Sequence, residues 1–270
     1  MPSFFERIWN SSPASLTRAL QRRVRNLRAG EAWHEIAGGP ARGLRMLLPT
    51  PLDSGTAELV NGTFDQFFYE TIGRHRALKG ARCWDIGANI GYHTLALAAQ
   101  GAHVVAFEPG KANVERLQLH VDHNPEVAQR IKVLPVAVAD RDGEVSFKVS
   151  SDRTGASSGS HLSDASPPLG AAVYAAFDEC VVTALTMDTL VQMQGEPPPD
   201  IIKLDVEGAE HLVLKGGMQM LARHKPLLLV EVHHICVMLS LTEILLALGY
   251  KMSVLDRDHA SPSRCFIMAR

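Results

Sequence analysis

The chain has 270 residues, of which 46% are hydrophobic and 21% charged, with a formal net charge of −2. This composition is ordinary for a globular protein long enough for one α/β domain, and the charge gives no general attraction to nucleic acid. No apolar run approaches the ~20 residues that would span a bilayer. The cysteines show no C-x-x-C pair, and a reduced thiol at Cys83 without a visible secretion signal predicts a cytoplasmic location.

The first 30 residues carry six arginines and a single acid, Glu6. Apolar residues at helical spacing predict an amphipathic helix over 15–28. Such a helix either docks on the rest of the chain with its arginines in water or makes a weak contact with a membrane surface. A short strand at 43–49 and a partly helical stretch at 56–74 follow. We therefore predict a lead-in segment, 1–60, before the main domain, 61–270.

The stretch 81–94, ARCWDIGANIGYHT, combines a short apolar strand with a glycine turn, and a helix is predicted at 94–99. Gly87 and Gly91 allow a tight bend and a close approach of the backbone to a ligand. The amides at the start of the helix would face that ligand. Asp85 ends the strand, where ligands bind in open α/β sheets. A nucleotide-type cofactor is therefore expected.

The details of the turn favour one kind of nucleotide. The dinucleotide fingerprint G-x-G-x-x-G needs a middle glycine, and here Asn89 stands in its place. A carboxylate at Asp85 would repel a pyrophosphate but suits the ammonium of an amino-acid moiety. The pattern D-x-G-x-x-x-G resembles the motif of S-adenosylmethionine-dependent methyltransferases. A nicotinamide-dependent oxidoreductase is the less favoured alternative.

Two acids follow the next predicted strands. The strand at 102–107 ends in Glu108, about 20 residues after the glycine turn, which is the spacing of a carboxylate that binds ribose hydroxyls. Alternatively, Glu108 caps the helix at 112–120. The strand at 132–139 ends in Asp140, which either receives the amino group of an adenine or belongs to a turn that continues to Gly143.

The second half of the chain alternates strands and helices. Strands are predicted at 144–149, 180–185, 201–205, 227–231, 250–255 and 264–268. Helices are predicted at 187–194, 209–215 and 239–248, the first of them capped by Thr186. The segment 150–170 is rich in Ser, Gly, Asp and Pro and is interpreted as a loop, with a possible role as a lid or acceptor loop. This order predicts an α/β fold with a doubly wound, mostly parallel sheet and a terminal antiparallel hairpin.

Taken together, the motifs between residues 62 and 250 resemble those of the FkbM family of methyltransferases. The resemblance is carried by Tyr69-Glu70, DIGANIGYHT at 85–94, Glu108-Pro109, Ala139-Asp140 with Asp142-Gly143, KLDVEGAE at 203–210, and LKG at 214–216. It implies the seven-stranded, Rossmann-like class I fold, with the final strand inserted antiparallel. It also implies S-adenosylmethionine as methyl donor. The acceptor would be a hydroxyl of a small molecule or glycan, such as a sugar, glycolipid or polyketide-type natural product. A methyltransferase-like protein that binds its ligand without catalysis is the alternative.

The resemblance and the strand ends together define the candidate site. The residues expected to bind the cofactor are Glu70, Asp85, Gly87, Ala88, Asn89, Gly91, Glu108 and Asp140. Asp205 and His233 follow neighbouring strands and are predicted to take the acceptor proton. No metal is predicted, although Asp205, Glu231 and His233 could instead hold a divalent cation. Acceptor choice is expected to depend on residues 1–60 and 150–170.

Overall fold

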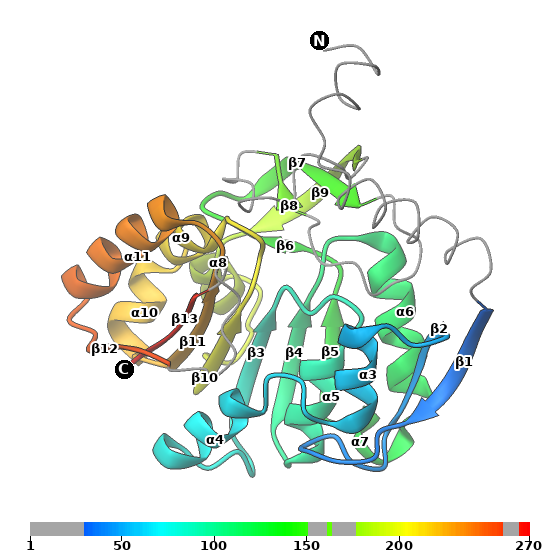
Figure 1. Ribbon diagram of the computed structural model, residues 1–270. Coiled ribbons are helices and arrows are strands. Elements are labelled where there is room, and N and C mark those ends of the chain that lie inside the picture. Colours follow the sequence, from blue (N-terminus) through cyan, green and yellow to red (C-terminus); the bar gives the residue numbers. More distant parts are fainter. Residues whose placement is uncertain (1–29, 151–160, 164–176, 256–264) are drawn as a thin grey trace, which may run out of the picture.

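The computed structural model describes residues 30–150, 161–163, 177–255 and 265–270 (Figure 1). Its centre is a seven-stranded sheet in the order β12-β13-β11-β10-β3-β4-β5. These strands are β3 Arg82–Ile86, β4 His103–Phe107, β5 Ile131–Leu134, β10 Ile201–Leu204, β11 Leu227–Val232, β12 Met252–Val254 and β13 Cys265–Ala269. β13 runs antiparallel to both β11 and β12, whereas β11, β10, β3, β4 and β5 are parallel. The predicted fold class is confirmed.

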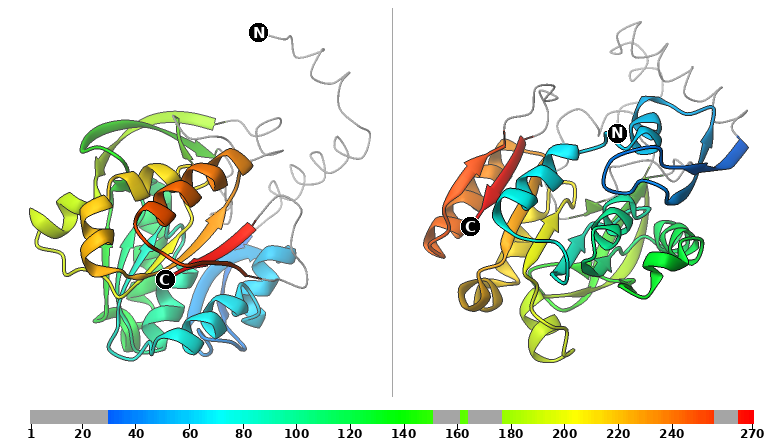
Figure 2. Two further views of the ribbon diagram at one scale, coloured as in Figure 1. Left: turned by 90° about the vertical axis from the view of Figure 1, so that its left-hand side faces the viewer. Right: turned by 90° about the horizontal axis from the view of Figure 1, so that it is seen from below.

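Both faces of this sheet are covered, because its strands are apolar on both sides. Cys83 and Trp84 are neighbours in β3, yet they belong to different core clusters. The Cys83 side packs on α3 Ser54–Asn61, α4 Gln66–His75, α5 Tyr92–Ala99 and α7 Pro125–Ala128. The Trp84 side packs on α8 Met187–Gln192, α9 Glu210–Lys215, α10 Met218–His224 and α11 Ile235–Ala247. Figure 2 shows the helices on the two sides of the sheet.

The described part of the N-terminal segment shares the core of the catalytic domain. The strands β1 Gly30–Glu35 and β2 Arg45–Thr50 form an antiparallel pair. Met46 and Leu48 of β2 are buried in the same cluster as Leu95 of α5. β2 is also tied to α6 Lys111–Asp122 through the buried His120. The predicted helix at 15–28 lies outside the described residues.

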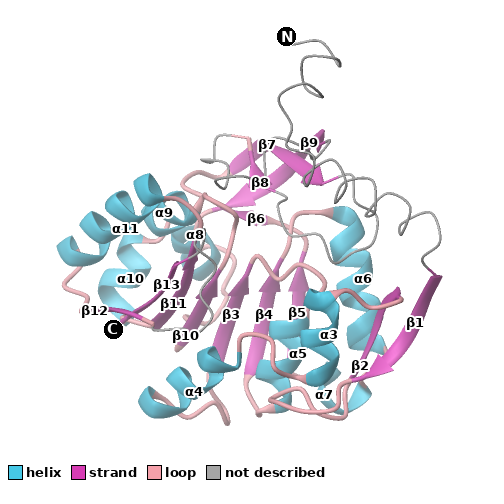
Figure 3. Ribbon diagram, in the orientation of Figure 1, coloured by secondary structure: helices cyan, strands magenta, loops and turns pink. Residues whose placement is uncertain are grey.

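A smaller sheet crosses the carboxyl ends of β3, β4 and β5 (Figure 3). Its order is β6-β9-β7-β8, with β6 Ala137–Val138, β7 Gly143–Ser150, β8 His161–Leu162 and β9 Phe177–Leu185. The single strand predicted at 132–139 is wrong: it divides into β5 and β6, which lie in different sheets. Pro135 stands at the break and lacks the amide that would continue the ladder.

Two further expectations are settled by the local geometry. Thr186 is the N-cap of α8, and its hydroxyl accepts a hydrogen bond from Thr189 N at 3.0 Å, as predicted. The loop predicted at 150–170 is wrong at β8, which pairs with β7. The rest of that segment, 151–160 and 164–170, lies outside the described residues. Within the described chain, none of the helices combines the length and apolarity needed to cross a membrane.

Candidate active site

The two sequence motifs pack directly against each other at the carboxyl edge of the central sheet. Gly87 has a φ of +80°, and a Cβ at this position would lie 1.7 Å from the carbonyl oxygen of Asp205. The Lys203 ammonium donates to the Gly87 carbonyl at 3.0 Å. A side chain at residue 87 would therefore force apart the turn after β3 and the turn after β10. This contact explains the glycine better than the approach of a ligand does.

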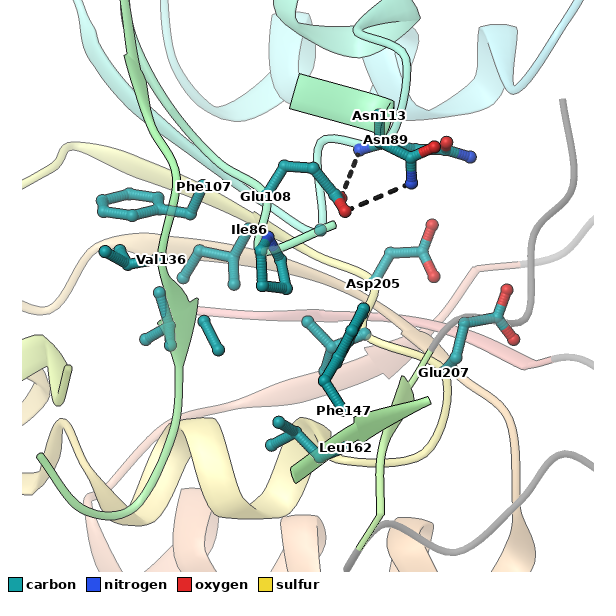
Figure 4. A pocket seen from close by; sticks show the side chains of 15 residues that line it. Ile86, Asn89, Phe107, Glu108, Asn113, Val136, Phe147, Leu162, Asp205 and Glu207 are labelled. Carbon is teal, nitrogen blue, oxygen red and sulfur yellow. Dashed lines mark hydrogen bonds between the residues drawn. The ribbon is translucent and has the colours of Figure 1, made fainter. Parts of the chain in front are cut away.

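A first cavity of about 640 Å³ opens beside these turns (Figure 4). Its apolar wall is built by Ile86, Phe107, Pro109, Val136, Ala137, Val138, Phe147, Leu162 and Val206. Phe147 and Leu162 come from β7 and β8, so the smaller sheet forms one wall of the cavity. Polar groups gather at one end, where Asn89, Glu108 and Asn113 lie together. An apolar cavity with polar groups at one end suits a nucleoside.

Glu108 is fixed at the polar end of the first cavity and is 4% exposed. Its Oε2 accepts from Asn89 N at 2.9 Å, while Oε1 accepts from Gly110 N at 2.9 Å and from Asn113 Nδ2 at 3.2 Å. Burial raises the pKa of this carboxyl, and the three hydrogen bonds partly oppose the rise. Because a carboxylate has about four acceptor positions, Oε2 can still accept a hydrogen bond from a ligand hydroxyl.

A second cavity, of about 1040 Å³, lies on the other side of the glycine turn. It is lined by Asp53, Ser54, Gly55, Thr56, Leu59, Phe64, residues 87–93, Lys203, Asp205, Glu207 and Glu231. The two cavities have Gly87, Asn89, Asp205 and Glu207 in common. In Figure 4 the carboxylates of Asp205 and Glu207 point away from the apolar wall of the first cavity. These two acids therefore stand at the boundary between the cavities.

Four carboxylates surround one imidazole at the ends of β10 and β11, and we call this group the carboxylate–histidine cluster. The His233 Nδ1 donates to Glu210 Oε1 at 3.0 Å. The His233 Nε2 lies 3.4 Å from Glu231, 3.5 Å from Glu207 and 3.6 Å from Asp205. Burial alone would lower the pKa of His233, but hydrogen bonds to Glu210 and Glu231 and the nearby charges raise it to about 11.

This environment bears on the role predicted for His233 and on the protonation of Glu207. An imidazole with a pKa of about 11 is already protonated near neutral pH, so these surroundings do not favour His233 as a base. The pKa of Glu207 is raised to about 7, first by burial and then by the charges of Asp205 and Glu231, against the lowering effect of His233. Glu207 has a φ of +56°, which holds it in the left-handed region.

Lys203 connects the cluster to the end of β3. Its ammonium lies 3.3 Å from Asp85 Oδ1 and 3.3 Å from Asp205 Oδ2. Burial would lower the pKa of Lys203, but the charges of Asp205, Asp85 and Glu231 outweigh burial and raise it. The amine is therefore positively charged at the carboxyl edge of the sheet. Its contact with Oδ2 of Asp205 keeps that oxygen directed away from His233.

The structure places three of the predicted cofactor residues away from the cavities. Asp85 is fully buried, pairs with Lys203 and accepts from Thr94 Oγ1 at 2.6 Å, and it lines neither cavity. Asp140 pairs with its neighbour Arg141 and also lines neither cavity. Glu70 lies on α4 with 54% of its side chain exposed, 3.9 Å from Arg74. Their predicted contacts with a cofactor have no support in this geometry.

The remaining predicted cofactor residues lie at the cavity walls. Gly87 and Asn89 line both cavities, Glu108 lines the first, and Ala88 and Gly91 line the second. The wall contributed by Phe147 and Leu162 was not predicted from the sequence, because strand pairing in the smaller sheet is a long-range property. Glu207 and Glu210 were not predicted as site residues either, although the repeated acids of KLDVEGAE indicated a charged site.

The sheet order with its reversed β13 and the ligand cavities at the carboxyl edge define a class I methyltransferase fold. Comparison with known proteins supports this class. Residues 85–252, more than half of the chain, match the model of the methyltransferase FkbM domain. The chain therefore belongs to the FkbM methyltransferase family, as the sequence resemblance predicted.

Two individual proteins illustrate this relationship. The hexuronic acid methyltransferase AglP of Haloferax volcanii is 30% identical over 152 residues, which are 56% of this chain and 55% of that protein. The chain thus spans about half the length of this curated relative. The crystal structure of methyltransferase FkbM from Methylobacillus flagellatus KT is 21% identical, with a TM-score of 0.51 over 71% of this chain and 44% of that chain. The structural likeness concerns the fold alone.

Proposed function

We propose that the chain is an S-adenosylmethionine-dependent O-methyltransferase that acts on a hydroxyl of a sugar-related acceptor. The observation that carries this proposal is the pair of cavities that meet at Asp205 and Glu207. The first cavity would hold the adenosine part of the cofactor, and the second would hold the methionine part and the acceptor. The hexuronic acid named for the Haloferax volcanii relative supports a sugar-related acceptor.

The polar groups of the first cavity fit an adenosine. Asn89 lines both cavities, and its buried side-chain oxygen has no hydrogen-bond partner among the described residues. A bound ligand with donor groups would satisfy it. Glu108 is fixed by three protein donors and keeps acceptor capacity for ribose hydroxyls. The apolar wall from Phe107 to Leu162 would cover the two faces of an adenine.

Methyl transfer from S-adenosylmethionine would require the protein mainly to position the reacting groups. When bound, S-adenosylmethionine supplies a methyl group that its sulfonium has already activated. The chain has to hold an acceptor oxygen in line with that methyl group and receive a proton. Asp205 lies at the boundary between the cavities, so it is the residue best placed to receive this proton. The start of α3, from Asp53 to Thr56, would contact the acceptor from the opposite wall of the second cavity.

The test is a transfer assay with S-adenosylmethionine carrying a labelled methyl group. The acceptors are a hexuronic acid glycoside, the matching neutral hexoside and a non-sugar alcohol. We expect label in a sugar product that resists mild alkali, because a methyl ether on a hydroxyl is stable there. Label that mild alkali releases would show transfer to a carboxylate and would contradict the hydroxyl assignment. Transfer only to the non-sugar alcohol would contradict the acceptor class.

A further inference from the structure

The carboxylate–histidine cluster has donor spacings that suit one bound ion. One ligand atom each from Asp205, Glu231 and His233 lie within 4.8 Å of one another. The His233 Nε2 is 3.4 Å from Glu231 Oε1 and 3.6 Å from Asp205 Oδ1. Two donors that each bind an ion at about 2.1 Å are separated by about 3.0 Å at a right angle and about 3.4 Å at a tetrahedral angle. The two separations that involve His233 fall close to this range, and all three donors lie within 4.8 Å of one another.

Neighbouring residues orient the donor atoms of His233 and Asp205 toward each other. Glu210 holds the Nδ1 of His233, which leaves Nε2 facing Asp205 and Glu231. Lys203 holds Oδ2 of Asp205, which leaves Oδ1 facing His233. Ligating histidines and carboxylates in metal sites have outer partners of this kind, which fix the ring orientation and the free oxygen.

The charge balance of the cluster supplies an independent observation. Glu210, Glu231 and His233 are buried, Asp205 and Glu207 are half-buried, and no side chain among them is more than 25% exposed. Lys203 adds one positive charge but shares it with Asp85. Glu210 is fully buried, and its Oε2 has no hydrogen-bond partner among the described residues. Carboxylates held close together in a largely buried site are costly, and a divalent cation bound among them would offset this cost.

We propose that Asp205, Glu231 and His233 bind one divalent cation, which replaces the proton on the Nε2 of His233. Asp205 and Glu231 both line the second cavity, so the open coordination positions of the cation face the acceptor side. Two neighbouring hydroxyl oxygens of a sugar-type acceptor would occupy those positions, which would orient the acceptor. This role rests on the proposed function, whereas the binding of the cation does not. One nitrogen and two oxygen donors suit Mn²⁺ better than Mg²⁺, which prefers an all-oxygen shell.

The test uses the full chain, freed of metal with EDTA and dialysed, and Mn²⁺ alone as the probe. Titration followed by electron paramagnetic resonance is expected to show one Mn²⁺ bound per chain. Glu231→Gln and Asp205→Asn should each raise the Mn²⁺ dissociation constant at least about 10-fold. Glu196→Gln serves as the control, because Glu196 is also buried but pairs with Lys132 outside the cluster. Circular dichroism would establish that each variant is folded.

Wild-type protein that binds no stoichiometric Mn²⁺, or folded Glu231→Gln and Asp205→Asn variants with unchanged affinity, would overturn the proposed site. Calorimetric titration with S-adenosylmethionine in EDTA separates this failure from a failure of the proposed function, because cofactor binding needs no cation. Methyl transfer that continues at full rate in EDTA would overturn the role of the cation in orienting the acceptor. Transfer that stops in EDTA and returns with Mn²⁺ would support it.

Discussion

Each oxygen of the Asp205 carboxylate lies close to a basic side chain, and these two contacts fix its orientation. Its Oδ2 lies 3.3 Å from the Lys203 ammonium, and its Oδ1 lies 3.6 Å from the His233 imidazole. The side chain is 25% exposed and lines both cavities. A carboxylate held in this way would meet an acceptor with little reorganisation, whether it receives the proton itself or binds a cation that orients the acceptor hydroxyl.

We expect Asp205→Asn to lower turnover by about 10²-fold or more, the usual range for loss of a general base. Affinity for S-adenosylmethionine should change little, because Asp205 would act on the acceptor and not on the bound cofactor. Steady-state kinetics with a labelled methyl donor, together with cofactor calorimetry, would measure both effects. Asp122→Asn, on the exposed face of α6, is the control. Full turnover in the folded Asp205→Asn variant would remove Asp205 from the mechanism.

At the residue scale, the sequence indicated which residues lie near the cavities better than it indicated which groups those residues contact. Glu108 was expected beside a ligand, and it lies at the wall of the first cavity. Asp85 was expected at the ligand too, yet its oxygens face Thr94 and Lys203 inside the protein. Lys203 comes from a strand more than a hundred residues away in the chain, and sequence spacing does not show which of two acids such a cation will join.

At the scale of the elements, one buried histidine connects three segments. The His120 Nδ1 donates to the carbonyl of Ile90 at 2.7 Å, and the Nε2 accepts from Leu47 N at 3.0 Å. The ring thus joins α6, β2 and the glycine turn. Burial lowers the pKa of His120, against the raising effect of these hydrogen bonds. The neutral ring is therefore the folded-state form.

This arrangement makes stability depend on pH. The unfolded chain protonates His120 near its ordinary pKa of about 6.5, whereas the folded protein resists protonation, so stability is full above that pH and falls as the pH drops below it. The contribution of one such group is at most about 1.4 kcal/mol per pH unit. Urea unfolding of wild type and His120→Gln at pH 7.5 and 5.5 should show the smaller pH effect in the variant.

His75→Gln, at an exposed position on α4, provides the matched comparison for this measurement. Its pH dependence should follow that of wild type. An equal pH dependence in wild type and His120→Gln would mean that the buried ring is not the group that titrates.

Elements with regular apolar patterns were predictable, whereas pairings between distant segments were not. The strands of the central sheet and Thr186 as a cap followed from local patterns of side chains. β5 and β6 separate at Pro135 because β6 pairs with β9 in the smaller sheet. The local sequence does not reveal that pairing. The smaller sheet was missed for the same reason, although β7 and most of β9 were expected as strands.

At the scale of the whole molecule, the structure places two cavities along one sheet edge. The smaller sheet covers the first cavity, while α3 and the carboxylate–histidine cluster border the second. The glycine turn lies between them, and its Gly87 carbonyl accepts a hydrogen bond from Lys203 of β10. Under the proposed function, the methyl donor would bind on one side of this turn and the acceptor on the other.

The central claim is that S-adenosylmethionine binds in the first cavity with its ribose on Glu108. Calorimetric titration of wild type and Glu108→Ala tests it most directly, with Glu115→Gln as a control on the exposed side of α6. We predict tight wild-type binding and a loss of about 1.5–3 kcal/mol in Glu108→Ala, the range for hydrogen bonds to a charged group. Glu115→Gln should match wild type. Unchanged affinity in folded Glu108→Ala, or preferential binding of NADH by wild type, would contradict the account.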